Sequence, residues 1–117
     1  MKKILIILFF LPTIGFGQSF VSPINYTNTE TNQKRVISYI KKDVKETYSS
    51  IGMDDPLTLR MMEKENLNAF KELIKISNTA LLQSVIDTYC EIGMCNYNTI
   101  LMMYREQSRA NNESLEW

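Results

Sequence analysis

Two methionine pairs and two cysteines are the residues whose types and spacing could do chemistry in this sequence. They are Met61, Met62, Met102, Met103, Cys90 and Cys95. Thioethers and thiolates are soft ligands that suit Cu(I), so these six residues form one candidate metal site. The same methionines could instead fill gaps between packed helices, or present an adaptable surface to a protein partner. Packing is the simpler interpretation, and we expect no cofactor.

The two cysteines stand five residues apart. An exported protein with an even number of cysteines usually pairs them. A disulfide between Cys90 and Cys95 would close a short loop and stabilise the fold by about 2 kcal/mol on the chain-entropy estimate. The spacing differs from the CxxC of thiol oxidoreductases, and without histidine it is a weak metal signal. The pair therefore predicts a structural disulfide, and the alternative is that strain at this short separation leaves both cysteines reduced.

Acid–base catalysis has few candidates in this chain. The absence of histidine removes the usual general base and the commonest metal ligand. Glu65 and Glu106 are one carboxylate pair that could lie near each other and exchange protons with a substrate. Two glutamates on helix surfaces are the simpler interpretation. We therefore expect no enzymatic activity.

Most of these residues belong to a stretch that the chain contains twice, at 47–65 and 88–106. The first copy reads TYSSIGMDDPLTLRMMEKE and the second reads TYCEIGMCNYNTILMMYRE. Nine of the nineteen aligned positions are identical, where ordinary residue usage gives about one. The duplication predicts two copies of one structural unit.

The elements that must position these residues are amphipathic helices. Apolar residues recur at three- and four-residue steps, with charged residues opposite them. Asp55 before Pro56 is typical of a helix start, and Asn96 takes the place of Asp55 in the second copy. The third helix is apolar over the widest arc, so we expect it to be central. The predicted helices cover about 34–50, 56–76, 80–92 and 97–110.

A glycine follows the first helix of each copy. Glycine adopts a left-handed conformation readily, and a helix often ends where it does so, in the Schellman motif. In this motif the residue after the glycine makes an apolar contact with a residue in the last turn of the helix. In both copies a tyrosine four positions before the glycine stands at that place in the last turn. The two predicted helix stops are Tyr48, Gly52 and Met53, and Tyr89, Gly93 and Met94.

The pattern predicts an all-α fold made of two helical hairpins, repeat one at 34–76 and repeat two at 77–117. Two such units are too few for a long solenoid, so we expect them to close on each other as a small four-helix bundle. Residues 18–33 are rich in Asn, Thr and Ser. We expect this polar N-terminal arm to be extended or mobile.

The N-terminus has the features of a secretory signal peptide, residues 1–17. Two lysines precede an apolar run, and a proline and small residues follow it. We expect cleavage after Gly17 or Gln18, no membrane span in the mature chain, and a periplasmic or secreted protein. Removal leaves eleven basic and thirteen acidic residues, a net charge of −2. The charges are interspersed, so we expect no nucleic-acid partner.

By elimination, the sequence favours a protein-binding module of the bacterial envelope, acting as an adaptor, inhibitor or immunity-type factor. The partner is an unidentified envelope protein or a second copy of the chain, and the alternative is a Cu(I)-binding protein. We expect Trp117 to dock on the end of the bundle with Leu115, with a short partner-binding motif as the alternative. The candidate partner-binding residues are Met61, Met62, Glu65, Met102, Met103, Glu106 and Trp117.

Overall fold

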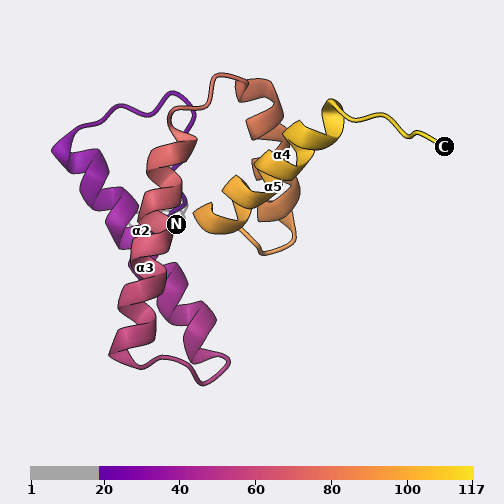
Figure 1. Ribbon diagram of the computed structural model, residues 1–117. Helices are drawn as coiled ribbons and strands as arrows, with labels where there is room; N and C mark the ends of the chain where they lie inside the picture. Colours follow the sequence, from indigo (N-terminus) through magenta and orange to yellow (C-terminus); the bar gives the residue numbers. More distant parts are fainter. Residues whose placement is uncertain (1–18) are drawn as a thin grey trace, which may run out of the picture.

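The computed structural model describes residues 19–117, and this range contains four α-helices and no strand. The predicted all-α fold is confirmed, and the helices form a small bundle (Figure 1). The predicted signal peptide lies outside the described residues. Within them, no helix is long and apolar enough to cross a bilayer. The helices are α2 (Glu30–Ser49), α3 (Pro56–Leu73), α4 (Thr79–Glu91) and α5 (Tyr97–Asn111).

Each of these helices begins at a polar residue whose side chain accepts a hydrogen bond from the backbone N–H three positions later. The donor–acceptor distances are 3.1, 3.0, 3.2 and 2.8 Å in chain order. Such caps satisfy N–H groups that have no partner inside the helix. Helix α2 begins four residues before the predicted position because its cap stands inside the polar arm. The capping residues are Thr29, Asp55, Asn78 and Asn96.

A glycine with positive φ follows the end of α2 and the end of α4, with φ of +76° at Gly52 and +83° at Gly93. The residue after each glycine donates its N–H to the carbonyl of a tyrosine five positions earlier, at 2.8 Å in both cases. Each glycine N–H also donates to the residue three positions earlier, at 3.1 and 3.2 Å. These paired bonds are those of the Schellman motif, and they satisfy carbonyls that the helix ends leave open.

Two helical hairpins meet through their second helices. Helix α2 packs against α3, α4 packs against α5, and α3 packs against α5 (Figure 1). The expectation that the third helix is central is therefore wrong. Helix α4 lies at the periphery, where Ala80 and Ile92 near its two ends are exposed to solvent. Helices α3 and α5 are central because each has a helix packed against it on two sides.

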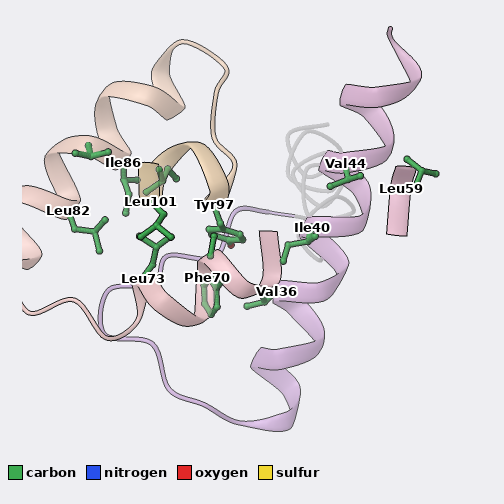
Figure 2. Packing of buried hydrophobic residues seen from close by; sticks show 13 residues of the cluster. Val36, Ile40, Val44, Leu59, Phe70, Leu73, Leu82, Ile86, Tyr97 and Leu101 are labelled. Carbon is green, nitrogen blue, oxygen red and sulfur yellow. The ribbon is translucent and has the colours of Figure 1, made fainter. Parts of the chain in front are cut away.

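One hydrophobic core runs through both hairpins. Figure 2 shows Val36, Ile40 and Val44 of α2 on one side and Leu82 and Ile86 of α4 on the other. Side chains of α3 and α5 fill the space between them. Tyr97, the first residue of α5, is 0% exposed although it carries a polar hydroxyl group. The central residues that Figure 2 labels are Phe70, Leu73, Tyr97 and Leu101.

The segment before α2, residues 19–29, is packed against this core rather than extended into solvent. The Tyr97 hydroxyl donates to the Val21 carbonyl at 2.7 Å and accepts from the Val21 N–H at 3.2 Å. Phe20 lies against the ring of Tyr97, with a centroid separation of 5.3 Å. Tyr26 meets Phe70 edge to face at 4.9 Å. Aromatic contacts and one buried hydroxyl therefore hold a segment whose composition is mostly polar.

Candidate functional site

A groove lies between α2 and α3. It consists of two adjoining pockets of about 520 and 150 Å³ that share Ile37 and Leu67. Figure 1 shows α2 crossing α3, so that the first turns of α2 diverge from the last turns of α3. Tyr26 of the N-terminal segment lines the end of the larger pocket. We call these two pockets the α2/α3 groove.

The α2/α3 groove has apolar walls. Val36 and Phe70 belong to the core and also line the larger pocket. Ile37 and Ile74 stand on opposite sides of it, with 40% and 37% of their surfaces exposed. Isolated exposed apolar residues are common on protein surfaces, but these line one concave site. The groove is therefore an apolar surface that no described residue covers.

Lysine side chains surround the apolar walls. Lys71 and Lys75 line the larger pocket, and Lys41 and Lys64 line the smaller one. Among the described residues, the one carboxylate that lines either pocket is Glu63, and the guanidinium of Arg60 binds both of its oxygens, at 2.9 and 2.8 Å. Among residues 19–117, the only carboxylate within ion-pair distance of any of the four ammonium groups is Glu72, which lies 3.8 Å from Lys75. The rim therefore has a positive potential.

The methionine pairs divide between core and surface. Met62 and Met103 are half-buried and packed against the core. Met61 and Met102 are 49% and 55% exposed. The two members of a pair thus point in different directions, as adjacent helical residues do at about 100° per residue. Met53 and Met94, at the two helix stops, are also exposed.

The two candidate glutamates make separate polar contacts. The Glu65 carboxylate accepts a hydrogen bond of 3.3 Å from the Asn98 side chain, which links α3 to α5. The Glu106 carboxylate pairs with Arg109 one turn along α5. Each is therefore used in a contact of its own, and the geometry gives no support to a shared acid–base role.

A small polar pocket of about 140 Å³ lies where α2, α3 and the start of α5 meet. Asn66, 5% exposed, donates to the Met62 carbonyl at 3.0 Å and accepts from the Asn98 N–H at 3.2 Å. Burial raises the pKa of Asp43, which lines this pocket, and nearby Glu46 raises it further. The Asn66 contacts join α3 to the first turn of α5, so this pocket has a structural role.

The predicted disulfide is present. Cys90 and Cys95 are bonded across the turn between α4 and α5, with their Cα atoms 4.1 Å apart. The Tyr39 hydroxyl of α2 donates to the Cys95 carbonyl, so this turn is also tied to the first hairpin. Burial raises the pKa of Tyr39 above its ordinary value, with smaller contributions from Asp43 and Glu46. Disulfide sulfurs are not thiolates, so the candidate Cu(I) site loses its two strongest ligands.

The C-terminal segment, residues 112–117, leaves the bundle. Leu115 and Trp117 are fully exposed, and Figure 1 shows the segment running away from the helices. The expectation that both dock on the bundle end is therefore wrong. The last turns of α5 are polar and mostly exposed, so they offer no apolar surface for the two side chains. An ion pair between Arg109 and Glu113, at 2.7 Å, continues the polar character into the segment.

The sequence interpretation did not identify the α2/α3 groove. A signal for it exists in the spacing, because residues three, four and seven positions apart share one face of a helix. On α2, Ile37 and Lys41 are one turn apart, and on α3 Lys64, Leu67 and Lys71 follow the same rule. The sequence therefore shows an apolar residue one turn from a lysine on each helix, but it does not show how the two helices cross.

Comparison of the chain with known protein families, with characterised proteins and with solved structures finds no match.

Proposed function

We propose that this chain is a protein-binding module of the bacterial envelope, and that its α2/α3 groove receives an apolar, acidic segment of the partner. The observation that carries the proposal is the groove itself, an open apolar site with four lysines on its rim. Its larger pocket, about 520 Å³, is within the range of about 300–1,000 Å³ found for ligand sites. The classes of function that fit are an adaptor, an inhibitor and an immunity-type factor.

The chemistry of the groove favours a peptide segment over a nucleic acid. A nucleic acid would place phosphates on the lysines but leave the aliphatic walls around Ile37 and Ile74 exposed to water. A peptide with apolar anchors and flanking carboxylates satisfies both parts of the site. Apolar anchors near the centre of an interface supply most of the binding energy, and charged rims mainly increase the association rate and select partners.

No observation favours the copper alternative. Its two cysteines are oxidised, and each methionine pair is divided between core and surface. Measuring the metal content of the protein isolated from the envelope keeps this alternative open to test, and stoichiometric copper would revive it.

Site-specific photo-crosslinking tests the proposal. The exported protein carries benzoylphenylalanine in place of Ile37, in the groove, or in place of Ile92, which is more exposed but lies in the other hairpin. In envelope extract we expect a discrete crosslinked protein from position 37 and none from position 92. The double variant Lys71→Glu/Lys75→Glu should abolish the product.

The matched control for charge is Lys42→Glu/Lys45→Glu, which changes two exposed lysines of α2 that do not line the groove. It should leave crosslinking intact, and circular dichroism should show that both double variants fold. Equal crosslinking from positions 37 and 92 would contradict the proposal. So would a product from position 37 that consists of a long-chain fatty acid and no protein.

A further inference from the structure

We propose that a second copy of the chain supplies the segment that binds in the α2/α3 groove, and that this segment is the C-terminal one, residues 112–117. The inference rests on the proposed function, because it names the partner of the same site. It follows from two described features that complement each other, an uncovered basic-rimmed groove and an uncovered apolar, acidic segment.

The C-terminal segment has the chemistry that the groove requires. Leu115 and Trp117 are among the most exposed large apolar residues of the described chain. The segment has no regular secondary structure, and in an extended chain residues two positions apart point to the same side. Leu115 and Trp117 then face one way, at a separation of about 7 Å. The two adjoining pockets of the groove offer two apolar sites side by side.

The charges match as well. Among residues 19–117, Lys41, Lys64 and Lys71 have no carboxylate within ion-pair distance, and Glu116 has no cationic partner. In an extended segment Glu116 points away from the face of its apolar neighbours, toward the rim of a groove that holds them. Docking therefore pairs an unpaired carboxylate with unpaired ammonium groups and removes an indole ring from water.

The position of the segment favours a neighbouring copy over the same chain. Figure 1 shows the C-terminus on the side of α4 and α5, pointing away from the hairpin that carries the groove. The contact joins different surfaces of the two copies, so it is a heterologous interface. A single such contact leaves one free groove and one free segment. These two either bind each other, which closes a dimer with two reciprocal contacts, or bind further copies, which gives a larger ring or an open chain.

Analytical ultracentrifugation of the exported protein over a range of concentrations tests the inference. We expect the mass to rise with concentration from that of a monomer to that of a dimer or a larger assembly. A segment variant, Leu115→Ala/Trp117→Ala, and a groove variant, Lys71→Glu/Lys75→Glu, should each remain monomeric. The control Leu57→Ala removes another exposed leucine, 76% exposed and outside the groove, and should assemble as the unmodified protein does.

Mixing the two defective variants gives a sharper result. The segment variant retains an intact groove and the groove variant retains an intact segment, so an equimolar mixture should form heterodimers and nothing larger. A fluorescent peptide of residues 110–117 should bind the segment variant, and its Trp117→Ala form should bind about thirtyfold more weakly or worse, as expected on losing a central aromatic anchor.

Two results would overturn the second-copy assignment. One is an unmodified protein that stays monomeric at every concentration while position 37 still crosslinks a different envelope protein in a Lys71- and Lys75-dependent way. In that case the proposed function stands. The other is a monomer whose groove accepts the peptide only after Leu115→Ala/Trp117→Ala, which would show that each chain closes its own groove. A groove that binds neither peptide nor envelope protein would overturn both proposals.

Discussion

Tyr97→Phe should destabilise the fold by about 2 kcal/mol, although it removes a single oxygen atom. The Tyr97 hydroxyl donates a hydrogen bond to the Val21 carbonyl at 2.7 Å and accepts one from the Val21 N–H at 3.2 Å. A protein hydrogen bond contributes about 0.5–1.5 kcal/mol net, so losing two costs about 1–3 kcal/mol. Val21 is half-buried, so water can replace only part of what is lost. The midpoint of that range is our estimate.

Urea unfolding followed by circular dichroism measures this change as a lower midpoint with an unchanged slope. For a chain of this size, the melting temperature should fall by about 8–16 °C. Tyr104→Phe is the matched control, because Tyr104 is a half-buried residue whose hydroxyl makes no hydrogen bond to another described residue; the substitution should cost under about 0.5 kcal/mol. If Tyr97→Phe were as mild as the control, the two hydrogen bonds would not hold the N-terminal segment.

The pH dependence of stability gives a second readout of the same residue. Burial raises the pKa of the Tyr97 phenol above its unfolded value, and the hydrogen bond from Val21 opposes part of this shift. The stability that this shift contributes is complete below about pH 10, the unfolded pKa, and is lost as the pH rises toward the folded pKa. The alkaline loss of stability should be smaller in Tyr97→Phe, and Tyr39, whose pKa is also raised, should account for a part that remains.

Three further predictions concern other parts of the fold. Gly52→Ala and Gly93→Ala should each cost about 1 kcal/mol in urea unfolding, because alanine resists positive φ and the added Cβ meets no atom within 4 Å that could add a clash; no loss in either variant would contradict the Schellman assignment. Asp43→Asn should raise the melting temperature at pH 7 and have no such effect below about pH 4, because the raised pKa of this carboxyl means that its charged form destabilises the fold; a stabilisation that persisted in acid would refute this explanation. The unreduced protein should be two hydrogens lighter than the reduced form and lose about 2 kcal/mol of stability on reduction, whereas alkylation of Cys90 and Cys95 without reductant would show that the disulfide does not form.

Local signals predicted the helix boundaries where the chain marks them with a polar cap or a glycine. Asp55 followed by Pro56 marks the start of α3, and Gly52 and Gly93 follow the ends of α2 and α4. The prediction placed the start of α2 too late because residues 30–35 are all polar, so they contain none of the apolar residues whose spacing indicates a helix. Thr29 determines that start, in a segment with many other residues of similar type.

The docking of residues 19–29 and the groove could not be predicted from local patterns, because both depend on residues far apart in the sequence. Val21 finds its partner 76 positions away. The groove forms where α2 and α3 cross, and the crossing depends on packing along the whole hairpin. The same limit applies to Trp117, because a tryptophan two positions after a leucine predicts docking only if the fold places an apolar surface near them.

The two hydrogen bonds between Val21 and Tyr97 also limit the order in which parts of the chain can fold. Synthesis proceeds from the N-terminus, so Phe20 and Val21 are made first and have no partner until Tyr97 follows. Bringing Val21 and Tyr97 together closes a loop of 76 positions, which costs conformational entropy. The contacts that offset this cost form only after α5 has been made. The aromatic cluster therefore forms late: the growing chain cannot complete its native core until most of its length, up to Tyr97, has been synthesised.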